Sequence, residues 1–144
     1  MQVSRHAAAS AALSALVYVG TGSAHATVSS FLAGWLIDVD HLLDYVVEHG
    51  LRLDRAYFFA TFDEDRYRKA RLVLHGWEWP VALAAASWLL GGEMVTAGLA
   101  FGWLQHLVFD QFANRARPLA YSLAARAVKG FDYQAFFPSS RRTR

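Results

Sequence analysis

Hydrophobic residues dominate two long stretches of the chain, and basic residues lie outside them. No lysine or arginine occurs between residues 6 and 51 or between residues 72 and 114. Each stretch is interrupted once by a glycine-containing turn, Thr21-Gly22-Ser23 in the first and Gly91-Gly92-Glu93 in the second. This pattern predicts two helical hairpins. Their four arms run approximately over His6–Gly20, Ala26–Asp38, Leu74–Leu90 and Met94–Asn114.

The composition limits the class of protein. A chain of 144 residues accommodates one domain, which we expect to cover residues 1–144. Apolar residues make up 55% and charged residues 18%, which excludes a disordered tail or a highly solvated helical array. The absence of cysteine excludes disulfides, iron–sulfur clusters and thiolate metal sites. The net charge of +2 gives no case for nucleic acid binding.

The basic residues form three groups that the two hairpins separate: Arg5 alone, six residues within Arg52–Arg71, and seven within Arg115–Arg144. Helical arms of roughly 15–20 residues rise ~23–30 Å, enough to cross a thin bilayer. The positive-inside rule then predicts a multi-pass protein of the inner membrane, in contact with lipids and with both termini cytoplasmic. The predicted fold class is all-α, a membrane-embedded four-helix bundle with Arg52–Arg71 as an amphipathic connector.

Two alternatives to this membrane hypothesis stay open. One is a soluble all-α domain with unusually apolar helices. The other is a secretory signal peptide, because the apolar run Ala7–Gly20 is followed by Ala24-His25-Ala26, which fits an A-x-A cleavage site. Cleavage there would make the mature chain begin at Thr27, although the chain continues directly into another apolar segment.

Nearly all candidate metal ligands lie inside the two stretches without basic residues. They form three clusters, Asp38-Val39-Asp40-His41-Leu42-Leu43-Asp44, in which Asp40 and Asp44 share a face if the segment is helical, His75-Gly76-Trp77-Glu78, and His106-Leu107-Val108-Phe109-Asp110. Histidine and carboxylate without cysteine is the ligand set of hydrolytic Zn²⁺, Mn²⁺ or Fe²⁺ sites. The i,i+3 and i,i+4 spacings of the second and third clusters allow each pair to face one side of a helix.

Folding each hairpin about its turn brings the clusters together. Glu78 then lies about level with His106, and Asp38 about level with His6. His25 lies at the opposite end of its helix, ~20 Å from Asp38, and is not an expected ligand. Taken singly, these residues are also common as helix caps or hydrogen-bonded pairs, but their coincidence at one depth favours a metal site. The candidate ligands are His6, Asp38, Asp40, His41, His75, Glu78, His106 and Asp110.

The motifs also suggest a family. Residues 34–44, G-W-L-I-D-V-D-H-L-L-D, resemble the signature of bacterial and archaeal membrane-bound metal-dependent hydrolases related to the LexA-regulated inner-membrane hydrolases. In that family a P-D-x-D-H segment follows an early helix headed by a histidine, a place that His6 matches. The family's G-x-x-x-H-x-x-x-D helix is matched by residues 102–110. The resemblance covers about residues 4–114 and implies metal binding and hydrolase activity.

Two positions depart from the family pattern. Ile37 stands in place of the usual proline, and the central motif, which has two histidines in close relatives, offers His75 and Glu78 here. Glu78 therefore either replaces a ligand or acts as a general base, and Asp40 is the other candidate base if it binds no metal.

These observations predict an integral membrane hydrolase that uses a divalent metal, Zn²⁺ with Mn²⁺ or Fe²⁺ as alternatives, on an ester or phosphoester of a small molecule or lipid. Two alternatives stay open. One is a non-catalytic membrane protein in which a structural metal or a His/Asp cluster locks the helices together. The other is a relay of protons or ions. The surplus of ligands over the four of a structural site favours catalysis, and the sequence indicates neither the substrate nor the oligomeric state.

Overall fold

The computed structural model describes residues 3–51, 54, 67–114 and 116–137. This part of the chain is helical and contains no strand, which confirms the predicted all-α class. Most of the predicted connector, residues 52–71, lies outside the described residues, and its described end, residues 67–71, is not helical. The helices are α1 (Val3–Thr21), α2 (Ala24–Leu36), α3 (Val39–His49), α5 (Glu78–Leu89), α6 (Met94–Ala113), α7 (Leu123–Val128) and α8 (Tyr133–Phe136).

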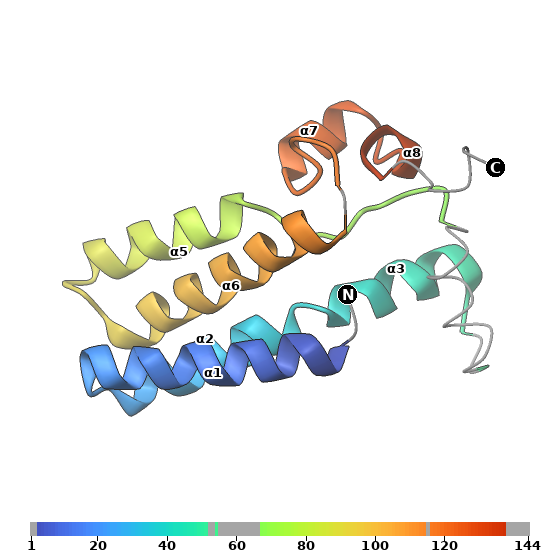
Figure 1. The fold of residues 1–144 in the computed structure, drawn as a ribbon. Coiled ribbons are helices and arrows are strands. Elements are labelled where there is room, and N and C mark those ends of the chain that lie inside the picture. The colour runs from blue at the N-terminus through green and yellow to red at the C-terminus, as the bar shows by residue number, and fades with distance from the viewer. Residues whose placement is uncertain (1–2, 52–53, 55–66, 115, 138–144) are drawn as a thin grey trace.

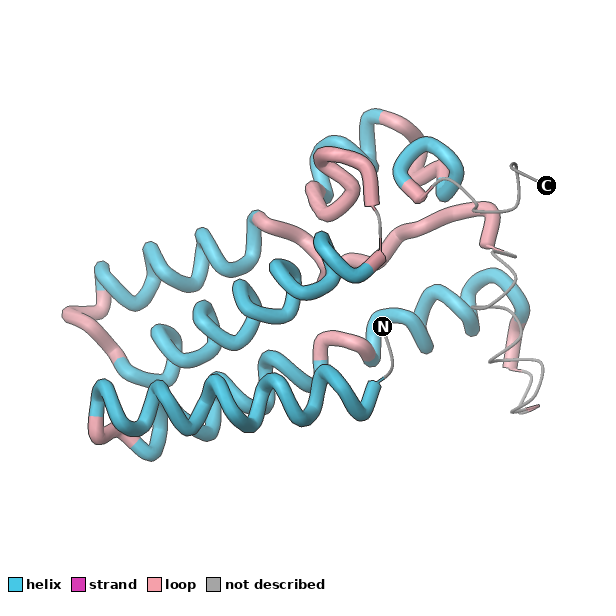
Figure 2. The backbone as a smooth tube through the Cα atoms, viewed as in Figure 1, coloured by secondary structure: helices cyan, strands magenta, loops and turns pink. Residues whose placement is uncertain are grey.

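Both predicted hairpins are present, α1 with α2 and α5 with α6 (Figure 1). The turns need glycine, because Gly22, Gly91 and Gly92 have φ angles of 65°, 72° and 86° in the left-handed region. Ser23 and Glu93 then cap the helices that follow, each accepting backbone N–H groups of the first turn. Figure 2 shows the two hairpin loops at the same end of the molecule.

Small residues bring α2 and α6 into close contact. A Cβ atom at Gly98 would collide with Ala26 and Ser29, and one at Gly102 would collide with the Ser30 carbonyl group. Two helix backbones approach this closely only where one of them lacks a side chain. The contact fixes the register between the end of α2 and the C-terminal half of α6, where candidate ligands lie.

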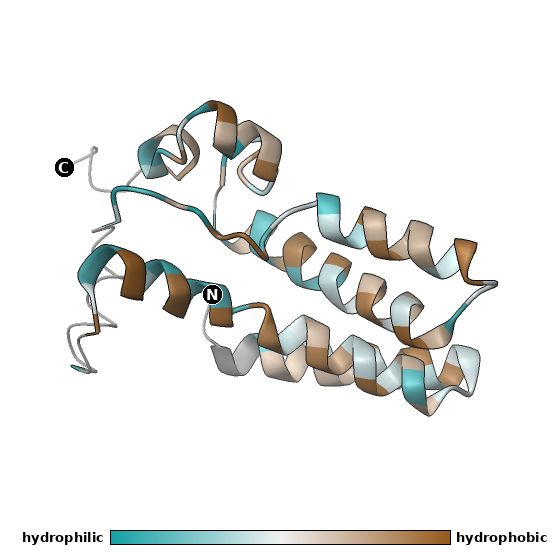
Figure 3. Cartoon of the chain, turned by 180° about the vertical axis from the view of Figure 1, so that it is seen from behind, coloured by the Kyte–Doolittle hydropathy of each residue, from teal (hydrophilic) through white to brown (hydrophobic). Residues whose placement is uncertain are grey.

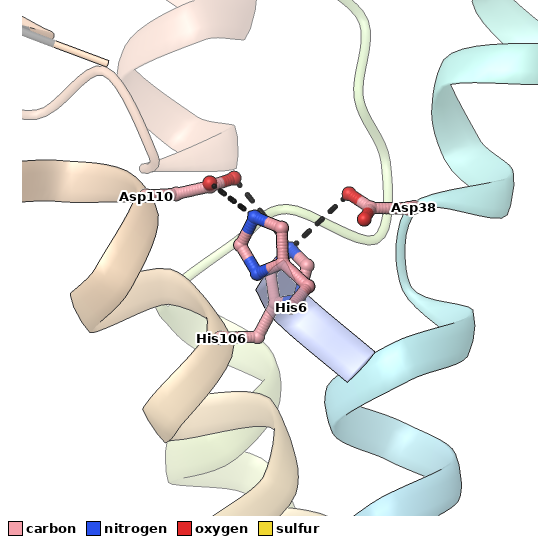
Figure 4. A group of neighbouring side chains, drawn as sticks. All are labelled: His6, Asp38, His106 and Asp110. Carbon is pink, nitrogen blue, oxygen red and sulfur yellow. Dashed lines mark ion pairs between the residues drawn. The ribbon is translucent and has the colours of Figure 1, made fainter. Parts of the chain in front are cut away.

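Two helix boundaries differ from the prediction. α5 begins at Glu78, later than expected, because the backbone N–H groups of His75 and of the preceding residue donate to the Asp40 carboxylate instead of entering a helix. The second arm is interrupted at Ile37 and Asp38, after which α3 begins. This break separates Asp38 from the regular helices on either side and turns it toward α6 (Figure 4).

No helix in the described part of the chain combines the length and the apolar character needed to cross a membrane. α5 has 12 residues and rises about 18 Å, against a hydrocarbon thickness of ~30 Å. α6 has 20 residues, but Gln105, His106 and Asp110 interrupt its apolar sequence. The predicted multi-pass inner-membrane location with cytoplasmic termini is therefore wrong, and the membrane-embedded form of the bundle loses its support. The predicted lipid contacts rested on that location.

The main apolar core lies at the open end of the hairpins. It is formed by Ile37, Leu107, Ala120, Tyr121 and Phe136, which are all buried. Hydrophobic positions also occur along both hairpins (Figure 3), and many of these side chains are exposed. The core packs the C-terminal segment against the ends of α2 and α6, directly beside the candidate ligands.

Candidate metal centre

Six of the eight candidate ligands converge at the open end of the hairpins. They form two groups that share Asp38, and within each group one ligand atom per residue lies within 4.8 Å of the others. The first group, drawn in Figure 4, is His6, Asp38, His106 and Asp110. The second is Asp38, His41 and His75. The ligands thus come from α1, the α2–α3 break, α3, the segment before α5, and α6.

The spacing of the central atoms matches that of ligands around a metal ion. The Nε2 atoms of His75 and His106 are 3.3 Å apart, and Asp110 Oδ2 lies 3.5 Å from each of them. Asp38 Oδ1 lies 3.7 Å from His75 Nε2 and 3.4 Å from His106 Nε2. A tetrahedral ion with bonds of ~2.0–2.1 Å separates its ligands by about 3.3–3.4 Å.

Hydrogen bonds on the far side of each ring orient the two central imidazoles. His75 Nδ1 lies 3.3 Å from Asp40 Oδ2, and His106 Nδ1 lies 2.9 Å from the Gly34 carbonyl oxygen. Both partners are acceptors, so each Nδ1 donates its hydrogen. In the neutral rings Nε2 then carries a lone pair directed into the cluster, which is the arrangement of metal-binding histidines.

His6 and Asp110 form a buried side of the cluster. His6 Nε2 lies 3.1 Å from Asp110 Oδ1, and its ring stacks on that of His106 with centroids 4.3 Å apart. The close pair is not aligned for a hydrogen bond, and Asp110 Oδ1 accepts none from the described residues. A buried carboxylate oxygen without a donor is costly, and a bound cation removes that cost.

Protons and a metal compete for this cluster. Burial raises the pKa values of Asp38 and Asp110, but the surrounding histidines favour the ionised carboxylates and hold both pKa values well below the usual range. Burial lowers the pKa of His75, yet the carboxylates of Asp110, Asp38 and Asp40 raise it to about 10. Burial and the nearby His75 lower the pKa of His41 to about 4. Metal binding to such a site displaces protons.

Three carboxylates on one face of α3 hold the segment that delivers His75. Each accepts two backbone N–H groups, and their spacing of four residues follows the helical repeat. The pairs are Glu48 with Arg68 and Lys69, Asp44 with Arg71 and Leu72, and Asp40 with Leu74 and His75. The segment therefore needs no helix or strand of its own to satisfy these backbone donors.

Arg126 holds the same segment through its carbonyl groups. The side chain is fully buried, and its Nη2 donates to the carbonyl oxygens of Leu72 and His75 at 3.0 and 2.6 Å. Leu72 has a φ of 40°, a conformation that residues with side chains rarely adopt without support. Asp44 and Arg126 supply that support, so residues outside the cluster impose the path that brings His75 into it.

The two remaining candidate ligands lie outside both groups. The Glu78 carboxylate accepts hydrogen bonds from Ser122 Oγ at 2.8 Å and from the N–H groups of Leu123 and Ala124 at the start of α7. These bonds outweigh burial and lower the pKa of Glu78. The structure thus places Glu78 at the start of α7, outside both ligand groups, and its expected roles as ligand or base stay predictions. Asp40 faces the backbone and His75 Nδ1, so it orients a ligand and is not placed as a base.

Two residues that shape the centre, Glu48 and Arg126, were missed by reasoning from the sequence. The spacing placed Asp44 on one helix face with Asp40 but gave it no role, and Glu48 repeats the same spacing of four residues, which was a usable signal. Arg126 gave no such signal, because its partners are backbone carbonyls far away in the sequence. The sequence therefore carried a signal for only some of the residues that position His75.

Comparisons with family models, curated proteins and solved structures give no match to the chain. The resemblance to membrane-bound metal-dependent hydrolases therefore stays an expectation from short motifs. Of their residues, Asp38, His41, His75, His106 and Asp110 belong to the two groups described above, and Asp40 does not.

Proposed function

We propose that this chain is a metal-dependent hydrolase whose His/Asp cluster binds a divalent cation, Zn²⁺ first and Mn²⁺ or Fe²⁺ as alternatives. One observation carries the proposal. The Nε2 atoms of His75 and His106 lie 3.3 Å from each other and 3.4–3.7 Å from the carboxylates of Asp38 and Asp110, while both Nδ1 atoms are engaged elsewhere. Lone pairs and ionised oxygens at this spacing need positive charge between them.

The two sides of the cluster differ in access. His6 and Asp110 are almost fully buried and exclude water from the inner side. The side chains of His41 and Asp38 are 33% and 17% exposed, so the cluster is partly open to solvent on their side. An accessible edge on an otherwise closed site is what separates catalytic from structural metal sites.

The proposed reaction is hydrolysis of an ester or phosphoester. When bound, a divalent cation lowers the pKa of a coordinated water to near 7 and polarises the substrate oxygen. The likeness of the motifs to membrane-bound metal-dependent hydrolases supports the same class of reaction. A lipid substrate and an ion relay both depended on helices that cross a membrane, and they are not part of this proposal.

A non-catalytic metal site is the second candidate, and the burial of the cluster favours it. His6, His75, His106 and Asp110 are each at most 2% exposed. A metal there would tie α1 and α6 to the segment before α5 without any turnover. This alternative predicts that metal raises the stability of the protein but that no substrate reaches the ion.

Metal content and hydrolysis of model substrates test the proposal together. The chain is purified in chelator, incubated separately with Zn²⁺, Mn²⁺ and Fe²⁺, and desalted before elemental analysis. The loaded protein is then assayed with p-nitrophenyl acetate and bis(p-nitrophenyl) phosphate. We expect bound metal, metal-dependent hydrolysis of one substrate, and loss of both in His106→Ala.

His25→Ala is the matched control, because His25 is an exposed histidine that belongs to neither ligand group. It should retain the metal content and the activity of the original chain. Bound metal without hydrolysis of either substrate favours the non-catalytic alternative. A folded chain that binds none of the three metals contradicts both candidates.

A further inference from the structure

The cluster holds more ligands than one ion uses. Six side chains contribute to two overlapping groups, whereas a catalytic zinc site takes about three protein ligands and a structural site about four. The two groups share only one residue, the Asp38 carboxylate. A carboxylate shared between two sets of ligands is the arrangement expected where two ions lie side by side.

Several separations at Asp38 suit an intervening ion better than a hydrogen bond. Asp38 Oδ1 lies 3.9 Å from His41 Nε2 and 3.7 Å from His75 Nε2. Both distances are too long for hydrogen bonds, since a contact of about 3.6 Å is no longer one. They exceed the about 3.3–3.6 Å between tetrahedral ligands with bonds of about 2.0–2.2 Å, but they lie below about 4.4 Å, the most that two such bonds can span.

The buried side offers an independent observation. Asp110 is 2% exposed, and its Oδ1 accepts no hydrogen bond from the described residues although His6 Nε2 is 3.1 Å away. The other oxygen of the same carboxylate faces His75 and His106. A single ion at the centre of the cluster would leave the Oδ1–His6 pair misaligned, whereas an ion between His6, Asp110 and His106 engages it.

We propose that the centre binds two divalent cations bridged by Asp38, an inference that rests on the proposed function. The inner ion is held by His6, His106, Asp110 and Asp38, and the outer ion by His41, His75 and Asp38. Four protein ligands close the inner position, and three leave one coordination position open at the exposed edge. Paired ions clamp the attacking and leaving oxygens in phosphoester hydrolysis, so the substrate class is a phosphoester.

Metal counting tests the two-ion arrangement apart from activity. Elemental analysis should find about two ions per original chain and about one in His41→Ala, which removes a ligand of the outer ion only. Asp38→Asn should bind less metal than His41→Ala, because it weakens both positions. His25→Ala should keep the content of the original chain. Helical circular dichroism identifies any variant that fails to fold.

Electron paramagnetic resonance of the Mn²⁺-loaded original chain gives a second measurement that needs no variant. Two ions bridged by one carboxylate should give an exchange-coupled spectrum, and His41→Ala should give the spectrum of isolated Mn²⁺. One ion per original chain with an uncoupled spectrum overturns the bridged pair but leaves a one-metal hydrolase in place. No metal in a folded chain overturns the proposed function itself, so the two failures are distinguishable.

Discussion

The two ligand groups are positioned in different ways. His6, His106 and Asp110 lie on α1 and α6, regular helices whose placement follows from backbone packing. His41 and His75 depend on a broken helix and on a segment that has no regular structure. The first group is fixed by close packing of small residues, such as Gly98 and Gly102, and the second by hydrogen bonds between charged side chains and the backbone.

This difference separates residues that keep the protein folded from residues that adjust its metal binding. At Gly98 and Gly102 there is no room for even one methyl group. A larger residue there therefore disturbs the whole α2–α6 contact, because packed interiors adjust poorly. The segment before α5 is held by three separate carboxylates, so the loss of one of them disturbs only the backbone groups that it binds. Substitutions in the packed region should therefore unfold the protein, and substitutions around the segment should alter metal binding in a chain that remains folded.

The largest expected effect is that of Gly102→Leu. Even a Cβ atom at this position meets the Ser30 carbonyl group of α2, so a leucine side chain forces α2 and α6 apart. We expect a loss larger than the ~1–3 kcal/mol of ordinary overpacking, with loss of a cooperative thermal transition and of metal. Gly20→Ala is the control, since nothing lies within 4 Å of that position. A Gly102→Leu protein of unchanged melting temperature would contradict the close contact.

Arg126→Met should have the next largest effect. It removes the donor to the carbonyl oxygens of Leu72 and His75, of which the Leu72 oxygen keeps the His75 N–H while the buried His75 oxygen loses its donor. We expect a loss of about 1–3 kcal/mol in urea unfolding, with faster amide hydrogen exchange confined to the segment before α5. Arg117→Met is the matched control, because Arg117 is exposed and donates to one carbonyl only. Equal effects of the two variants would refute the special role of Arg126.

Asp40→Asn should alter metal affinity more than folding. The substitution keeps an acceptor near the backbone but weakens the charged partner of His75 Nδ1. Loss of such an outer partner typically costs 10–100-fold in metal affinity, which competition with a chelating dye measures. Glu48→Gln makes the same chemical change at the far end of α3 and should leave the affinity within about twofold of the original. Similar losses of metal affinity in both variants would contradict a specific effect of Asp40 through His75 Nδ1.

The sequence was sufficient to predict the helix-borne half of the centre. Gly22 and Gly91 marked the turns, and counting from them placed His6 near Asp38 and His106 near the start of the second hairpin. The i,i+4 spacing of His106 and Asp110 then put both on one face of α6. Each of these steps uses only regular helix geometry, which is why they could be made without coordinates.

The rest could not be predicted, because it depends on long-range bonds to irregular backbone. Glu78 meets Ser122, 44 residues away in sequence, and no local spacing signals that contact. The missing basic residues were interpreted as a sign of lipid contact, whereas the Gly, Ser, Gln and His residues of α2 and α6 lower the apolar character of those helices. The same polar residues build the helix contact and the metal centre.

The smallest effect is expected for Glu78→Gln, which tests whether Glu78 belongs to either ligand group. The variant should keep the metal content and hydrolysis of the original chain, because Glu78 is absent from both ligand groups. Hydrogen bonds at the start of α7 lower the pKa of Glu78 below its ordinary value of 4.5, so the charged form stabilises the folded state. That contribution, ~0.3–1 kcal/mol for an exposed acid at a helix start, is present above pH 4.5 and is lost as the pH falls through the lower folded pKa. The stability difference between the original chain and Glu78→Gln should therefore be measurable at pH 7 and vanish in acid. A variant that loses metal at pH 7 would instead return Glu78 to the list of ligands.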